Sequence, residues 1–470
     1  MKTAVMLVSL LVLPPNAIAQ SPWDNGPLKV SENGRYLQHA NGGPFFWLGD
    51  TVWLMSQKLD RDHIATYFAD RKAKGFNVVV INLVQNFDDR SFNGSLALLD
   101  DDITKLNVTP GSDPADPVQY DYWDHVDYIV ETAAASGIYV AMTPMWRFVD
   151  LPTPEQGSRF IEQLTARYGG RPNVIWVNGG SSRGGANPEF WNAAGAAMKR
   201  GAPTHLVTFH PFGRMQSSSW FHDSPWLDVN MFVSGHRRYD QDTEGNAYGE
   251  DNWRYVLEDL AKTPPKPTLD GEASFENTPQ GLHNPLEPYW NDGDVRRYSY
   301  WSVFAGACGH NYGENSVRQV YLPSDARPAS GAKGYFLERL DTPGANGMRH
   351  LKALMLSRPY FDRVNDQLAV AGDEGEKYER VLVTRGSDFL MAYVHTGRAF
   401  TLQMGRISGT DVVASWFDPR TGEVARLGTF KNEGTRTFDP PGEHANGNDW
   451  VLVLDDTSKN FGLPGTSAVE

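Results

Sequence analysis

Carboxylates and imidazoles recur in this sequence directly after short apolar runs, and Glu272 is the clearest case. It follows the short run Pro267–Leu269, and Gly271 frees the backbone just before it. Two prolines upstream exclude a helix at this point. In barrel enzymes the catalytic groups lie at the carboxyl ends of the strands, so Glu272 is a candidate catalytic carboxylate. A solvated acidic loop is the competing interpretation in a chain of net charge −14.

Polar and aromatic side chains follow the other apolar runs as well, and together they would line one binding mouth. Carboxylates and imidazoles mixed with Trp and Tyr suit a sugar, because aromatic faces stack on its CH surfaces and polar groups bond its hydroxyls. We expect substrate contacts from Asp50, Trp53, Gln85, Trp146, Asn178, Ser181, His210, His236 and Tyr312. With 14 Trp and 19 Tyr in the chain, some aromatic residues must belong to the core instead.

The elements that would position these residues alternate between strand-like and helix-like segments. We expect strands at 44–48, 77–82, 138–142, 173–177, 206–209, 227–232, 267–269 and 307–312. Helical spacing and caps predict helices at 60–74, 122–135, 153–168, 188–199, 253–261 and 294–305. This alternation predicts an α/β fold, a (β/α)₈ TIM barrel, with a doubly wound open sheet as the alternative. The barrel is favoured because aromatic and polar residues follow nearly every predicted strand, and in a barrel all of these loops meet at one mouth.

The remainder of the chain differs in character. Beyond residue 360, short alternating strands separated by Gly, Asn and Pro turns predict a small antiparallel β-sandwich. Residues 1–19 have the basic, apolar and small-residue pattern of a secretory signal, with cleavage expected near Ala19. The expected domains are therefore a signal at 1–19, a catalytic barrel at 20–360 and a β-sandwich at 361–470. We expect a secreted or periplasmic protein.

Composition excludes several classes of function. The acidic balance and the absence of Lys and Arg clusters argue against a nucleic-acid partner, and no segment is long enough to span a bilayer. Cys308 is the single cysteine, so no internal disulfide forms. No metal or nucleotide motif occurs, and the acidic stretch between 101 and 116 lacks the spacing of an EF-hand loop. We expect no cofactor and no metal, and the sequence does not determine the oligomeric state.

Several motifs together resemble the apiosidase-like glycoside hydrolases of family 140. They are Leu48–Trp53, Asn173–Gly180, Phe209–Pro211 with Ser217–His222, Ser234–His236, Lys266–Glu272 and Gly309–Gly313. The resemblance runs from about Leu28 to the C-terminus, and the last hundred residues resemble the small β domain of collagen-binding type that is often attached to such barrels. It implies an O-glycosyl hydrolase acting on a plant, algal or bacterial polysaccharide.

The resemblance also implies retaining chemistry with two carboxylates. Glu272 matches the nucleophile at the end of the seventh strand, about 5–5.5 Å from its partner in a retaining mechanism. The family pattern places Asp after Gly179-Gly180, where this chain has Ser181, and a serine hydroxyl does not serve as a general acid near neutral pH. Glu314 is the leading candidate for a relocated acid/base and Asp50 the second. Two alternatives stay open: a leaving group that needs little protonation, and a barrel that binds sugar without cleaving it.

A serine esterase is the alternative from another class of enzyme. The residues Gly180-Ser181-Ser182-Arg183-Gly184 fit the G-x-S-x-G pattern of α/β-hydrolases and follow a predicted strand. Ser182 would be the nucleophile, with His236 or His310 as its base. Against this hypothesis, the elbow serine should lead directly into a helix, whereas the next predicted helix begins only at Pro188.

Overall fold

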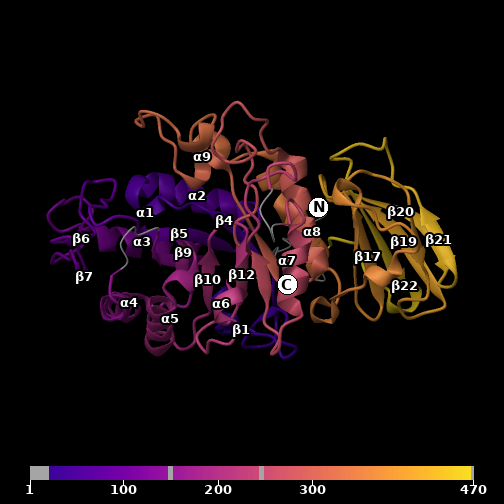
Figure 1. Ribbon diagram of the computed structural model, residues 1–470, viewed down its shortest axis with the longest axis horizontal. Coiled ribbons are helices and arrows are strands. Elements are labelled where there is room, and N and C mark those ends of the chain that lie inside the picture. The colour runs from indigo at the N-terminus through magenta and orange to yellow at the C-terminus, as the bar shows by residue number, and fades with distance from the viewer. Residues whose placement is uncertain (1–20, 147–151, 243–247, 467–470) are drawn as a thin grey trace, which may run out of the picture.

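The computed structural model describes residues 21–146, 152–242 and 248–466 (Figure 1). The predicted secretory signal lies outside the described residues. None of the helices in the described ranges is long and apolar enough to cross a membrane.

Eight parallel strands form the barrel that the sequence predicts. In the order in which they pair they are β4 (Trp47–Thr51), β5 (Val78–Val84), β8 (Tyr139–Met145), β9 (Val174–Ser182), β10 (Val207–Pro211), β12 (Asn230–Val233), β13 (Thr268–Asp270) and β14 (Gly309–Tyr312). Strand β14 pairs with β4, and a parallel bridge between Thr208 and Val229 brings the edges of β10 and β12 together. Most strands are fully buried, as their Val- and Ile-rich sequences predict for strands covered on both faces.

Helices cover the outside of the barrel (Figure 1). They are α1 (Met55–Lys58), α2 (Arg61–Ala73), α3 (Tyr122–Ala135), α4 (Pro154–Tyr168), α5 (Pro188–Gly201), α6 (Ser218–Phe221), α7 (Asn252–Leu260), α8 (Asp292–Ala305), α9 (Asn315–Arg318) and α10 (Pro343–Leu356). The side chains of Asp60, Asp121, Thr153 and Asn291 accept N–H groups at the first turns of α2, α3, α4 and α8. These caps explain why the starts of α2 and α4 are predictable from sequence.

The segment before the barrel corrects the predicted first strand. Pro44–Phe45 is β3, which pairs with β2 (Leu37–His39) and β1 (Leu28–Val30) in a separate three-stranded sheet. The barrel strand β4 begins only at Trp47. A proline has no N–H to donate to a central sheet, which fits its place in this outer sheet.

Short elements occur in both the barrel part and the C-terminal part of the chain. Two hairpin pieces, β6 (Leu98–Leu99) and β7 (Asp102–Leu106), pair with each other, and β11 (Met215–Gln216) runs antiparallel to β12. Single 3₁₀ turns occur at Pro22–Asn25, Gly184–Ala186, Ala329–Gly331, Leu337–Arg339, Tyr360–Asp362, Gln367–Ala369, Lys377–Glu379 and Thr457–Lys459.

The C-terminal part is an antiparallel sandwich, as expected. Its larger sheet has the order β15 (Val364–Asn365), β16 (Val381–Arg385), β17 (Phe389–Val394), β22 (Trp450–Asp456), β19 (Asp411–Phe417) and β20 (Val424–Lys431). The second sheet consists of β18 (Phe400–Gln403) and β21 (Thr435–Phe438). Val383, Leu402 and Trp416 belong to one apolar core that includes both sheets.

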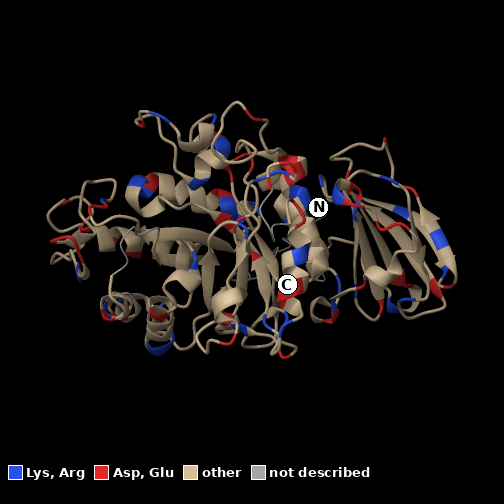
Figure 2. Ribbon diagram, in the orientation of Figure 1, with Lys and Arg blue, Asp and Glu red and all other residues tan. Residues whose placement is uncertain are grey.

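Helix α8 joins the barrel to the sandwich. Figure 2 shows residues of both charges along this helix, and Arg296 donates two hydrogen bonds of 3.1 Å to Asp449 next to β22. The rings of Tyr300 and Tyr393 stack with centroids 4.8 Å apart. Both ion-pair partners are buried, so the two parts pack as one body rather than as domains on a flexible tether.

Candidate active site

Glu272 follows β13 at the carboxyl end of the barrel, where two histidines converge on its carboxylate. Nε2 of His236 lies 3.0 Å from Oε1, and Nε2 of His210 lies 3.3 Å from Oε2. An ionised carboxylate only accepts hydrogen bonds, so each Nε2 carries the hydrogen and donates it. Each carboxylate oxygen thus has one imidazole donor, while 7% of the residue's surface is still exposed.

These contacts keep Glu272 ionised. Burial by itself would raise the pKa of Glu272, but the hydrogen bonds from His210 and His236 outweigh it and hold the pKa well below its ordinary value. The carboxylate is therefore charged at any pH at which the protein would work. A charged, partly accessible carboxylate is suited to attack as a nucleophile and not to donate a proton.

The end of β9 fixes the orientation of His210. The backbone N–H of Ser181 lies 3.3 Å from Nδ1 of His210, which accepts it when the hydrogen is on Nε2. A second hydrogen on Nδ1 would instead meet the Pro211 carbonyl at 3.1 Å. In both protonation states Nε2 donates to Glu272. Ser181 itself has a left-handed backbone with φ of 54°.

Gly271 is required for packing rather than for an unusual backbone angle. A Cβ at this position would lie 2.4 Å from Sδ of Met231 in the neighbouring strand β12. Because no real Cβ approaches an atom so closely, any larger residue would force the buried Met231 side chain or the strand end that carries Glu272 to move. From the sequence this glycine is expected for its backbone freedom, whereas the structure explains it by close packing against β12.

Aromatic rings surround the carboxylate and its histidines. The rings of Trp53 and Trp146 lie 4.8 Å apart at 38°, and Trp146 lies 5.1 Å from the His210 ring. Phe275 lies 5.6 Å from Trp53 and 4.9 Å from His236. The guanidinium carbon of Arg318 lies 5.3 Å from the centroid of the Trp53 ring. Sequence analysis did not single out Phe275 and Arg318, although Phe275 follows Glu272 by only three residues.

Three predicted substrate contacts lie inside the barrel wall instead. Asp50 is fully buried and accepts hydrogen bonds of 2.6 Å from Tyr67 and Arg71. The Asn178 side chain is bonded to the backbone, since its Nδ2 donates to the Trp191 carbonyl at 2.8 Å. All of them belong to strands rather than to the loops that follow, and their burial argues against direct contact with a substrate.

Tyr312 is the third of these residues. Its hydroxyl donates to Glu276 at 2.5 Å and lies 3.0 Å from the hydroxyl of Thr342. The same Glu276 carboxylate accepts the backbone N–H of Gly344 in the first turn of α10 at 3.2 Å. Tyr312 therefore links β14 to α10 and has 1% of its surface exposed.

Glu314, the predicted acid/base, caps helix α9. Its Oε2 accepts the backbone N–H groups of Ser316 and Val317 at 2.6 and 2.9 Å, and its Oε1 accepts from Asn277 at 3.1 Å. Burial raises the pKa of Glu314 to about 7, a value that suits an acid, but the residue has no exposed surface. Contacts made only with backbone and amide N–H groups favour a capping role, and the acid/base prediction finds no support in this geometry.

The last two predicted residues, Gln85 and Ser182, have hydrogen-bond partners other than Glu272. Gln85 follows β5, is half-buried and donates its backbone N–H to Asp89 at 2.5 Å. Ser182 donates to the Gly180 carbonyl at 3.2 Å, and within the described ranges no histidine hydrogen bond to its hydroxyl occurs. The esterase hypothesis requires such a bond. Across those same ranges no group of three or more His, Cys, Asp or Glu residues could hold a metal ion.

Comparisons with known proteins place both parts of the chain in described families. Residues 31–362 match the family described as "Apiosidase-like, catalytic domain". Residues 364–455 match the family described as "Putative collagen-binding domain of a collagenase". No curated protein matched the chain.

Two solved structures are similar over nearly the whole chain. One, titled a glycoside hydrolase, is 41% identical with a TM-score of 0.90, covering 94% of this chain and 100% of its own. The other is a glycoside hydrolase family 5 protein from Bacteroides vulgatus ATCC 8482, which is 40% identical with a TM-score of 0.90. That alignment covers 96% of this chain and 98% of the Bacteroides chain.

Proposed function

Because the chain belongs to the apiosidase-like family of glycoside hydrolases, we propose that it cleaves glycosidic bonds of a polysaccharide with Glu272 as the nucleophile. The observation that carries this proposal is the Glu272 carboxylate held by the imidazole donors of His210 and His236. The substrate class is a plant, algal or bacterial polysaccharide, and the proposed mechanism retains the anomeric configuration. The proposed location is outside the cytoplasm, after removal of residues 1–19.

The chemistry follows from the charge on Glu272. Its carboxylate would attack the anomeric carbon as the bond to the leaving oxygen breaks, forming a glycosyl ester with the enzyme. Water would then attack the anomeric carbon and restore the carboxylate, and the proton that the water loses would balance the one taken up by the leaving oxygen. The two imidazole donors lower the basicity of Glu272, which makes it a better leaving group in this second step.

The aromatic residues would bind the sugar. Trp146 lies beside His210 and Trp53 lies beside Trp146, so a sugar ring placed over the carboxylate would lie near both rings. A polar substrate at this point would also find Arg318 next to Trp53. This arrangement supports a sugar as substrate more than an acyl ester, which would need the nucleophile and oxyanion donors at Ser182.

The test is release of reducing sugar from a panel of plant, algal and bacterial polysaccharides and of activated aryl glycosides. Wild type is compared with Glu272→Gln and, as a control at the competing nucleophile, with Ser182→Ala. We expect Glu272→Gln to lose activity at least about 10³-fold and Ser182→Ala to keep it. Proton NMR of the first product would show the retained anomer.

Three outcomes would contradict the proposal. Turnover that survives in Glu272→Gln would remove Glu272 from the reaction. Hydrolysis of acyl esters that disappears in Ser182→Ala, with no glycan cleaved, would establish the esterase instead. Binding of a glycan without cleavage by wild type would identify a barrel that only binds sugar.

A further inference from the structure

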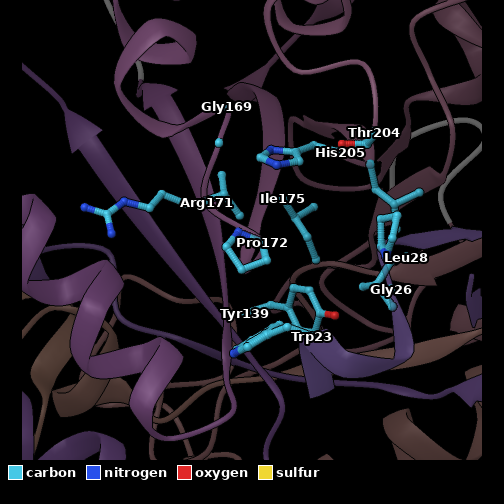
Figure 3. Close-up of a pocket in the computed structure, with 14 residues that line it drawn as sticks. Trp23, Gly26, Leu28, Tyr139, Gly169, Arg171, Pro172, Ile175, Thr204 and His205 are labelled. Atoms are coloured by element: carbon cyan, nitrogen blue, oxygen red, sulfur yellow. The ribbon is translucent and has the colours of Figure 1, made fainter. Parts of the chain in front are cut away.

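A cavity of about 340 Å³ lies at the opposite end of the barrel from Glu272. It is formed by the amino ends of β8, β9 and β10, and the 3₁₀ turn Pro22–Asn25 makes one wall (Figure 3). Its lining includes Trp23, Leu28, Tyr139, Pro172, Ile175 and His205. Ile175 and Ser181 are six residues apart on β9, so about 20 Å of strand separates this cavity from the Glu272 site.

Two buried polar atoms of the lining have no hydrogen-bond partner in the structure. They are the Tyr139 hydroxyl and Nδ1 of His205, in residues that are 2% and 7% exposed. Figure 3 shows the two side chains on opposite sides of the cavity, with Pro172 and Ile175 between them. A buried polar group without a partner costs free energy, so a ligand that satisfies both atoms would be bound favourably.

The two groups offer different hydrogen-bonding chemistry. Burial, with the positive charge of Lys199 added to it, lowers the pKa of His205 to about 4, so the ring is neutral at pH 7. The ring also bonds the backbone of Arg171, which leaves Nδ1 as an acceptor. Burial raises the pKa of Tyr139, so its hydroxyl stays protonated and can donate.

Arg171 is the only charged residue in the rest of the described lining, and Thr204 is its only other polar side chain. The Tyr139 ring is held edge-on by Trp23 at 4.8 Å and by Phe45 at 5.3 Å. The guanidinium of Arg171 pairs with Glu131 at 3.0 Å, and in Figure 3 its side chain extends away from the other lining residues. An ionised ligand would therefore have no unpaired countercharge in this lining.

We propose that this cavity is a second carbohydrate site, which binds one neutral sugar unit at the amino end of the barrel. A sugar ring combines CH surfaces for Trp23, Leu28 and Ile175 with hydroxyls that accept from Tyr139 and donate to His205. The volume lies within the range of small-molecule sites, at its lower end. A glycan held there would be anchored to the enzyme away from the bond being cleaved.

The probes are D-glucose, D-galactose, D-xylose, L-arabinose and L-rhamnose, with D-galacturonate as the charged counterpart. Binding to the full chain is followed by saturation-transfer NMR and calorimetric titration. At least one neutral sugar should bind wild type with a millimolar Kd, and galacturonate should bind more weakly than galactose. Tyr139→Phe should weaken the bound sugar at least about fivefold, since it removes one hydrogen-bond donor.

Matched variants separate this site from the rest of the molecule. Tyr255→Phe also removes a buried hydroxyl without a partner, from a different core cluster, and should leave binding unchanged. Tyr139→Phe deletes no bonded group, so we expect it to fold like wild type. The proposal is overturned if no neutral sugar binds, or if binding is indifferent to Tyr139→Phe and disappears in Trp146→Ala, which would place the sugar beside Glu272.

Discussion

Glu272 and Glu314 follow neighbouring strands of one barrel, and both are buried, yet their pKa values move in opposite directions. Imidazole donors hold the pKa of Glu272 below its ordinary value despite burial. At Glu314 burial prevails and raises the pKa to about 7, although three N–H groups oppose it. A perturbed pKa is thus a poor guide to the catalytic carboxylate by itself. Access to solvent separates the two, because only Glu272 keeps exposed surface.

Exchanging each glutamate for glutamine gives the largest expected contrast. Glu272→Gln should lose at least about 10³-fold in turnover with little change in melting temperature. Glu314→Gln should keep turnover within about fivefold but lose about 1–2 kcal/mol of unfolding free energy, because the cap of α9 is weakened. Reducing-sugar assays and urea denaturation of both variants measure the contrast. A Glu314→Gln protein of native stability that no longer turns over would make Glu314 the acid after all.

Removing an imidazole donor tests why the two pKa values differ. In His236→Ala, Glu272 loses one of two hydrogen bonds that stabilise its charge, so its pKa should rise. The nucleophile must be ionised, and activity is lost as the pH falls through its pKa. The acidic limb of the kcat/KM profile should therefore move to higher pH, with a loss of about 10–100-fold at pH 7.

The control for this variant is His63→Ala, whose imidazole pairs with Asp60 on the surface of α2. Its pH profile should match wild type. An acidic limb that does not move in His236→Ala would show that the imidazole contact does not set the ionisation of Glu272.

The barrel could be predicted from the sequence because its signals are local. Runs rich in Val and Ile mark β5, and an Asp or Thr cap marks the starts of α2 and α4. Elements with weak local signals were not predicted: α10, which contains two glycines, and the short strands β15 and β21. Pro44–Phe45 was assigned to the barrel because an apolar run continues through it into β4.

The candidate site was predicted less completely for a geometric reason. Successive residues of a strand point to opposite faces. If the predicted end of a strand is wrong by one residue, a buried side chain is therefore assigned to the mouth. Asp50 and Tyr312 belong to β4 and β14 and are buried with partners of their own. His210, His236 and Glu272 were all assigned to the mouth, but the contacts of both imidazoles with the carboxylate were not predicted. The capping role of Glu314 depends on the folded turn at α9.

Introducing a carboxylate at residue 181 should raise activity, in contrast to the losses of activity expected for Glu272→Gln and His236→Ala. One imidazole ring separates the Ser181 backbone from Glu272, because His210 contacts both at 3.3 Å. Asp tolerates a left-handed backbone better than most residues, so Ser181→Asp should fold. If Glu314 only caps α9, the new acid should raise polysaccharide cleavage at least about tenfold and aryl glycoside cleavage much less.

Ser181→Asn is the matched control, since it has the same shape without an acidic proton. Equal activity of wild type and both variants on polysaccharide would show that a proton donor already serves the site. Comparing substrates in one preparation keeps the result independent of small changes in stability.

The smallest effect concerns Asp259, a buried carboxylate held by hydroxyl and amide donors, which forms no ion pair with any described residue although the charge of Lys262 acts on it. It accepts hydrogen bonds from Gln216, Ser218 and Thr268 at 2.9, 2.5 and 2.5 Å. Burial nevertheless raises the pKa of Asp259 to about 6 from 3.8. The folded state then binds a proton more tightly than the unfolded state, so ionisation above pH 6 costs about 3 kcal/mol of stability.

Asp259→Asn should therefore increase the unfolding free energy by about 1–2 kcal/mol at pH 7, the remainder being lost to imperfect hydrogen bonds. As the pH falls from 6 toward 4, wild type becomes protonated and the difference should disappear. Urea denaturation at pH 7, 5 and 4 measures this, with the exposed Asp240→Asn as control. A constant difference at all three pH values would mean that Asp259 is not ionised at pH 7. Hydroxyl donors would then stabilise a buried carboxylate less than the imidazoles stabilise Glu272.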